Sequence, residues 1–130
     1  MPVAEAELRH RKTQFHLKTA DSIRDEISRA LGQDSPKSTQ ARAAVLAIMR
    51  ETLAAARTSA EADLMATGKG ARCAQNLSAA EDEIIRAIHQ FAVRSVYPVD
   101  NPSGAEAIAL AAVGGYGRGT LAPGSDIDLL

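Results

Sequence analysis

Aromatic and cysteine side chains are scarce in this chain of 130 residues, which has two Phe, two Tyr, no Trp and a single Cys. The lone thiol, Cys73, excludes an intrachain disulfide and a zinc site built from several cysteines, and it fits a reducing compartment. Hydrophobic residues reach 45% of the sequence, but alanine is the commonest of them and buries little apolar surface. We therefore expect a thin core, made by a helical layer that rests on further structure.

Neither an excess of charge nor a long hydrophobic run is present. The formal net charge is −1 and the isoelectric point is about 6.3, so the sequence predicts no basic surface for nucleic acid or anionic membranes. The longest strongly apolar run, AIALAAV at 107–113, is far shorter than the ~20 residues that span a bilayer. The first residues, MPVAEAELRHRK, lack the apolar segment of a signal peptide. A soluble, cytoplasmic protein is the expectation, with no nucleic-acid or membrane partner.

The spacing of hydrophobic residues predicts three helices before residue 100. Positions three and four apart share one face of a helix, and apolar residues repeat at that spacing over residues 4–31, 40–67 and 78–96. The polar segment QDSPKSTQ (33–40) contains a proline and predicts the loop between the first two helices.

Local signals indicate where these helices begin and end. Gly32 and Gly68 are typical residues after a helix end, and Pro98 stops the third helix. Ser78 and Glu81 have the spacing of a capping box, in which the serine oxygen accepts from a free backbone N–H and the glutamate reaches back. The sequence therefore predicts that the third helix begins at Ser78.

The pattern changes after residue 106 from helical to strand-like. AIALAAV (107–113) is a short apolar run ended by two glycines, which predicts a buried strand. SDIDLL (125–130) alternates polar and apolar residues, which predicts a second strand. The expected fold class is α+β, with about three helices followed by a strand, a turn and a strand.

Asp126 and Asp128 are the candidate metal ligands. Side chains two apart in a strand point to the same face, so both carboxylates are expected to project together. Close carboxylates repel one another unless a cation lies between them, and Mg²⁺ prefers such oxygen ligands. The alternative is a solvated strand edge, or a turn in which one aspartate caps a backbone N–H.

Gly114 and Gly115 form the candidate phosphate-binding turn. Glycine allows a sharp turn and the close approach of a bulky ligand, and the N-terminus of a short helix after the turn attracts phosphate. Arg118 is placed to contact the same anion, although a surface salt bridge explains this residue equally well. A triphosphate on the glycines and Mg²⁺ on the aspartates together indicate metal-assisted nucleotidyl transfer.

The segment VGGYGRGTLAPGSDIDLL (113–130) resembles the signature of the DNA polymerase beta-like nucleotidyltransferases: Gly-Gly, ten intervening residues and Asp-x-Asp. It is most similar to the branch of bifunctional uridylyltransferase/uridylyl-removing enzymes, in their alphaproteobacterial form. The strings RAAVLAIMRETLAAAR, DEIIRAIHQFA and VYPVDNPS resemble the N-terminal helical region of the same enzymes, so the resemblance covers roughly residues 40–130.

This resemblance implies a cytoplasmic bacterial enzyme that uses UTP and Mg²⁺. Such an enzyme transfers UMP to a tyrosine of the nitrogen-signalling protein PII, releases pyrophosphate and also removes UMP. By position, the catalytic metal ligands of the family match Asp126 and Asp128. Its nucleotide contacts match Gly114, Gly115, Arg118 and Ser125. For Ser125 the alternative is a turn residue that bonds the backbone.

The resemblance also implies a division of the chain and parts that lie beyond it. Residues 1–32 are expected to form an N-terminal helix, 33–106 a helical region, and 107–130 the truncated start of a nucleotidyltransferase domain. The family has a third carboxylate, an HD-type hydrolase domain and ACT domains that sense glutamine, so an N-terminal fragment without transferase activity of its own is expected. Two alternatives stay open: an adenylyltransferase acting, for example, on glutamine synthetase, and a non-catalytic helical interaction module.

Overall fold

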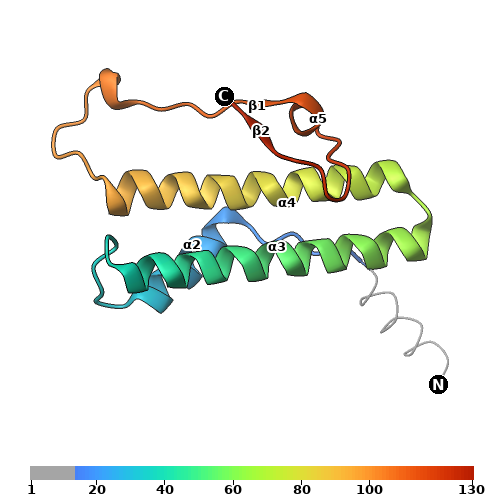
Figure 1. Cartoon of the computed structure of the whole chain (residues 1–130), viewed down its shortest axis with the longest axis horizontal. Helices are drawn as coiled ribbons and strands as arrows, with labels where there is room; N and C mark the ends of the chain where they lie inside the picture. The colour runs from blue at the N-terminus through green and yellow to red at the C-terminus, as the bar shows by residue number, and fades with distance from the viewer. Residues whose placement is uncertain (1–13) are drawn as a thin grey trace.

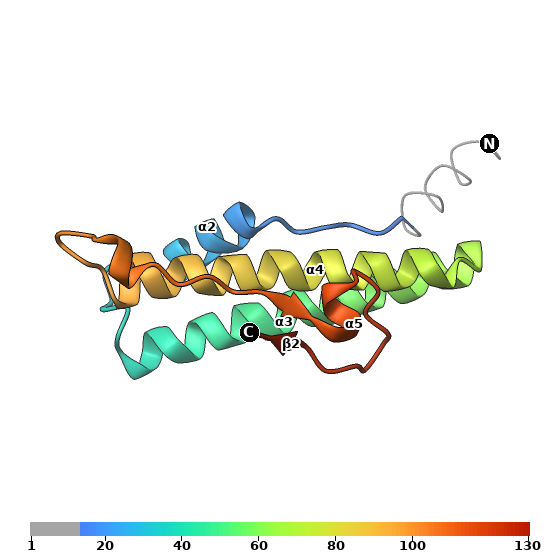
Figure 2. The ribbon, with the colours of Figure 1, turned by 90° about the horizontal axis from the view of Figure 1, so that it is seen from above.

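Three helices form the body of the protein. The computed structural model describes residues 14–130. Helices α3 (Thr39–Thr67) and α4 (Gly70–Phe91) run antiparallel side by side, and α2 (Ala20–Leu31) packs against both of them (Figures 1 and 2). Within the described part of the chain, no helix combines the length and the apolar character needed to cross a bilayer.

The second expected helix, 40–67, is confirmed as α3. Its N-terminus is capped by Ser38, whose Oγ accepts a hydrogen bond from the backbone N–H of Ala41 at 3.0 Å. Its C-terminus is closed by Gly68, which has a left-handed conformation with φ of 68° and donates its N–H to the carbonyl of Leu64 at 2.7 Å. Both ends therefore follow from the residues that the sequence places there.

The first expected helix, 4–31, is shorter than predicted. Residues 1–13 lie outside the described part of the chain, and residues 14–19 are not helical, because α2 begins at Ala20. The prediction of one continuous helix is therefore wrong for 14–19, whereas the predicted end at residue 31 is confirmed.

Two side-chain oxygens explain why α2 begins at Ala20. Thr19 Oγ1 accepts from the backbone N–H of Ser22 at 3.3 Å, and Glu83 Oε2 of α4 accepts from the backbone N–H of Ala20 at 2.6 Å. The first N–H groups of a helix have no partner inside it, so two well-placed acceptors favour a helix start at this point. One acceptor comes from α4, which the local sequence cannot reveal.

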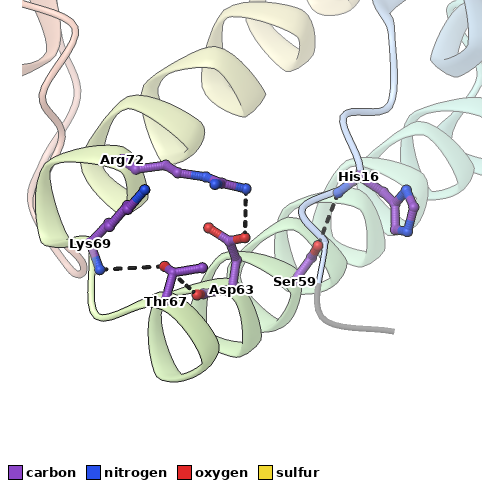
Figure 3. Close-up of polar contacts among 6 residues, drawn as sticks. All are labelled: His16, Ser59, Asp63, Thr67, Lys69 and Arg72. Atoms are coloured by element: carbon purple, nitrogen blue, oxygen red, sulfur yellow. Dashed lines mark hydrogen bonds and ion pairs between the residues drawn. The ribbon is translucent and has the colours of Figure 1, made fainter. Parts of the chain in front are cut away.

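The third expected helix begins at Gly70 rather than at Ser78, so that prediction is wrong. Only two residues separate α3 from α4. Arg72, in the first turn of α4, lies against Asp63 of α3, with its Nη2 2.8 Å from Oδ1 (Figure 3). The Asp63 side chain is only 2% exposed, and a buried carboxylate requires such a cation, which explains the tight connection.

Polar contacts of Thr67 complete this connection. Its Oγ1 donates to the carbonyl of Asp63 at 2.8 Å and accepts from the backbone N–H of Lys69 at 3.4 Å (Figure 3). Nearby, the backbone N–H of His16 donates to Ser59 Oγ at 3.1 Å, which joins the segment before α2 to α3. The connection between α3 and α4 is thus held by side chains of both helices and by a backbone N–H of the turn.

Ser78 and Glu81 lie inside α4 and do not form a capping box. Both are buried, and so is Cys73, which belongs to the helix and not to a loop. The predicted end at residue 96 is confirmed: α4 reaches Phe91 and continues as the π-helical segment η1 (Ala92–Val96).

Two hydrophobic clusters make up the core. The first joins the three helices and contains Ala20, Ile23, Ile27, Ile48, Met49, Ile84 and Ala87. The second lies nearer the α3–α4 connection and contains Ala60, Cys73, Leu77, Tyr116 and Leu121. Tyr116 and Leu121 belong to the segment 107–130, which we call the tail. The second cluster therefore attaches the tail to the helices.

The tail is a two-stranded antiparallel ribbon built around a glycine turn (Figure 1). Strand β1 (Ala112–Val113) leads directly into α5 (Gly114–Gly117), and the chain returns in β2 (Asp128–Leu129). Ala112 pairs with Leu129 and Val113 with Asp128. The described residues therefore have the α+β character that the sequence predicted.

Both expected strands are shorter than predicted. Of 107–113, only Ala112 and Val113 are in a strand, and of 125–130 only Asp128 and Leu129. The run 107–113 is not buried either: Ile108 is 66% exposed and Leu110 48%. Next to the two strands, the backbones of Ala111 and Leu130 form two hydrogen bonds with each other, of 2.8 and 2.9 Å.

Candidate functional site

Gly114 begins the turn that we call the glycine corner, residues 114–117 or α5. Its φ is 65°, a left-handed conformation that side chains disfavour. A Cβ on Gly114 would lie 2.6 Å from Oδ2 of Asp128, which is far too close. The backbone conformation therefore favours glycine, and a Cβ at this position would in addition displace the Asp128 carboxylate.

The other glycines of the corner have different surroundings. A Cβ on Gly117 would lie 2.5 Å from the carbonyl oxygen of Ala112, so the corner folds back closely onto β1. A Cβ on Gly115 would have Nη2 of Arg118 as its nearest side-chain atom, at 3.7 Å. Sequence reasoning selected Gly115 but missed the steric requirement at Gly117, because two-residue motifs do not show what the backbone folds against.

Asp128 points to the face of the ribbon that lies away from α4. Its neighbour Leu129 lines a cavity of about 260 Å³ between the ribbon and α4, together with Leu110 and Ala112. Successive side chains of a strand point to opposite faces, so Asp128 points outward, and it is exposed. Among the predicted site residues, the structure thus brings together Asp128 and Gly114.

Three further predicted site residues of the tail are exposed: Arg118, Ser125 and Asp126. One residue, Ile127, separates Asp126 from the start of β2, so Asp126 is not part of the ladder. The backbone N–H of Ser125 donates to the carbonyl of Ala122 at 3.0 Å and closes a turn. Arg118 follows α5 directly, and its guanidinium lies beside Gly115.

Mg²⁺ prefers oxygen ligands such as carboxylates, and Asp126 and Asp128 each carry a carboxylate. Over residues 14–130, no group of three or more His, Cys, Asp or Glu side chains is placed to hold a metal ion. The structure places one of these carboxylates, that of Asp128, at the glycine corner, and a shared Mg²⁺ stays a prediction.

Tyr116 attaches the glycine corner to α4. Its side chain is buried, and its hydroxyl donates to Oδ1 of Asp82 at 2.5 Å. Burial, followed by the hydrogen bond to Asp82 and the negative charge of that carboxylate, raises the pKa of Tyr116 above its ordinary value. Tyr116 therefore packs in the core and fixes the corner on α4.

A second attachment uses the backbone of the tail. The N–H of Leu121 donates to Oγ of Ser78 at 2.9 Å, and both residues are buried. Sequence reasoning missed Ser78 and Asp82 as partners of the tail. A serine and an aspartate in a helical pattern show no signal for a contact with residues about 40 positions away, a separation of 43 for Ser78 and 34 for Asp82.

Comparison with known proteins identifies relatives of this chain, among them two Bradyrhizobium enzymes. The chain is 46% identical over 98 residues to the bifunctional uridylyltransferase/uridylyl-removing enzyme of Bradyrhizobium sp. strain ORS 278, and equally to that of strain BTAi1 / ATCC BAA-1182. The resemblance read from the sequence is confirmed. The matched residues make up 75% of this chain and 10% of each relative, so the chain spans about a tenth of their length. No protein-family model and no solved structure matches the chain.

Proposed function

We propose that this chain carries the nucleotide-binding corner of a uridylyltransferase that moves UMP from UTP to a protein tyrosine, with PII as the acceptor. The similarity to the two Bradyrhizobium enzymes supports the uridylyl chemistry. The observation that carries the proposal is the contact between the Asp128 carboxylate and Gly114, because it places an acidic side chain at a turn able to receive phosphates.

The residues of the corner have separate roles in this proposal. The glycines leave the backbone N–H groups open to phosphate oxygens, and Arg118 beside Gly115 adds a positive charge for the same oxygens. Asp126 and Asp128 would hold Mg²⁺. When bound, the ion stabilises negative charge that develops on the oxygens around the transferred phosphorus. The protein's own contribution is to position these groups.

A chimeric enzyme tests the proposal. This chain replaces the segment that it matches in a Bradyrhizobium relative, and transfer of UMP to PII is measured with UTP and, separately, with ATP. We expect transfer with UTP and Mg²⁺, and none by the 130-residue chain alone. Asp126→Asn and Asp128→Asn should each lower kcat by about 100-fold or more, because several kcal/mol of stabilisation is lost at about 1.4 kcal/mol per factor of ten.

Asp100→Asn is the matched control, since Asp100 is an exposed aspartate in the loop after η1. Its kcat should equal that of the unsubstituted chimera. A folded chimera that transfers AMP instead of UMP would contradict the choice of nucleotide. A chimera whose activity survives both aspartate substitutions would contradict the site itself.

A further inference from the structure

Helix α4 holds the tail through two acceptors on one of its faces. Ser78 Oγ accepts from the backbone N–H of Leu121 at 2.9 Å, and Asp82 Oδ1 accepts from the hydroxyl of Tyr116 at 2.5 Å. Residues four apart in a helix lie on the same face, one turn from each other. The two anchored positions of the tail lie on either side of Arg118, so the segment with this predicted phosphate contact is held at both ends.

Tyr116 is the one residue of the glycine corner whose side chain is larger than a hydrogen atom. It is 4% exposed and packs in the second core cluster with Leu77 and Cys73 of α4. Three glycines in a single turn give a backbone with many accessible conformations, so an isolated corner would not keep one geometry. The side chain of Tyr116 is therefore what fixes the corner on the helices.

We propose that Asp82 is a positioning residue of the nucleotide site, which acts through the Tyr116 hydroxyl to hold the glycine corner against Asp128. This inference rests on the function proposed above. Packing alone buries the ring of Tyr116, but it leaves the ring free to slide or turn. A hydrogen bond to an ionised carboxylate is roughly twice as strong as one between neutral groups and has a defined direction.

The geometry explains why a small displacement matters. Asp128 and Gly114 approach so closely that no Cβ fits between them, and both must face the same phosphate and metal. Misplacement of reacting groups by about 1 Å lowers a rate by as much as 100-fold. Loss of the hydrogen bond to Asp82 should therefore lower kcat strongly, while the free energy of unfolding changes little.

Four variants of the chimeric enzyme separate positioning from folding. Tyr116→Phe keeps the ring and removes the hydroxyl, Asp82→Leu removes the acceptor, and Asp82→Asn keeps an acceptor oxygen. Tyr97→Phe is the matched control, because Tyr97 is 71% exposed. We expect Tyr116→Phe and Asp82→Leu to lower kcat by about 10- to 100-fold. KM for UTP should change less, and Asp82→Asn should recover most of kcat.

Three further measurements keep the outcomes distinct. The fraction of folded enzyme, from thermal unfolding, corrects kcat for any loss of structure, and the double variant Tyr116→Phe with Asp82→Leu should be no slower than the slower single variant. Hydrogen exchange of the Leu121 amide in the 130-residue chain should be faster in both single variants.

Unchanged kcat in both Tyr116→Phe and Asp82→Leu would overturn the inference, and so would equal losses in Asp82→Asn and Asp82→Leu. If the unsubstituted chimera is active, these results contradict the role of Asp82 and leave the proposed function standing. A folded but inactive unsubstituted chimera contradicts the proposed function, and this inference with it.

Discussion

Replacement of Gly114 by alanine tests whether the corner and Asp128 form one site. The added Cβ would lie 2.6 Å from Oδ2 of Asp128, whereas ordinary van der Waals contacts start near 3.4 Å. The carboxylate must therefore shift by about 0.8 Å. A shift of that size lowers a rate by up to about 100-fold when the carboxylate positions reacting groups. The left-handed φ of 65° adds about 1–2 kcal/mol of backbone strain.

Gly119→Ala is a close control for this variant. Gly119 has a φ of 69°, nearly that of Gly114, but no atom lies within 4 Å of its Cβ position. Both variants should therefore lose about 1–2 kcal/mol of stability through backbone strain. Only Gly114→Ala should also lose activity through the displacement of Asp128.

The assay is transfer of UMP to PII by the chimeric enzyme, with the free energy of unfolding measured on the same preparations. Gly114→Ala is expected to reduce kcat by about 10- to 100-fold relative to Gly119→Ala at equal loss of stability. If the two variants are equally active, Asp128 does not act at the corner, and the reasoning behind the site is refuted.

Three further predictions concern the helices and their contact with the tail. Arg72→Met leaves the Asp63 carboxylate buried without its cation and should lower the free energy of unfolding by about 1–3 kcal/mol in urea titrations, with a smaller loss for Arg72→Lys. Burial raises the pKa of Glu81, and the positive charge of Arg57 opposes this effect. The contribution of Glu81 to the free energy of unfolding is therefore most favourable below the ordinary carboxyl pKa, and it is lost as pH rises through the raised pKa. Glu81→Gln should therefore be more stable than the parent near pH 7, and urea midpoints should show no such advantage near pH 4. The raised pKa of Tyr116 means that its stabilising contact is present below about pH 10 and is lost at higher pH; in a Tyr97→Phe background, ultraviolet titration of this tyrosine should coincide with loss of tail structure.

Helix α3 could be predicted from the sequence because its signals are local. Ser38 supplies the first cap, Gly68 the last, and one apolar face repeats between them. The other helix starts could not be predicted, because distant side chains decide them. Glu83 of α4 accepts from the first N–H of α2, and the buried Asp63 of α3 requires the cation of Arg72 in the first turn of α4.

Ser78 shows how one local pattern fits two structures. A serine followed three residues later by glutamate is a good helix start, and nothing nearby contradicts it. In the fold, the serine oxygen accepts a backbone N–H from Leu121, and Glu81 is buried in the middle of α4. The prediction named the correct donor type but the wrong donor, since it considered only amides of the same helix.

The sequence indicates the residues of a candidate site, but it does not indicate which contacts hold them in place. Glycines and aspartates at a fixed spacing indicate phosphate and metal chemistry, and the structure places Asp128 at Gly114. Nothing in the spacing indicates that Tyr116 joins a hydrophobic cluster with residues of α3 and α4, or that Asp82 accepts a hydrogen bond from its hydroxyl. Those contacts depend on how the ribbon lies on the helices, which is a property of the tertiary structure.

The expected boundary between residues 106 and 107 separates two patterns in the sequence, helical and strand-like. The packing does not follow it. Ala60 of α3 and Leu77 of α4 share one hydrophobic cluster with Tyr116 and Leu121 of the tail. A ribbon of two short strands cannot hold its own turn in place, because an isolated hairpin is only marginally stable in water. The glycine corner therefore depends on the helices for its shape, because residues of α3, of α4 and of the tail share one hydrophobic cluster across that boundary.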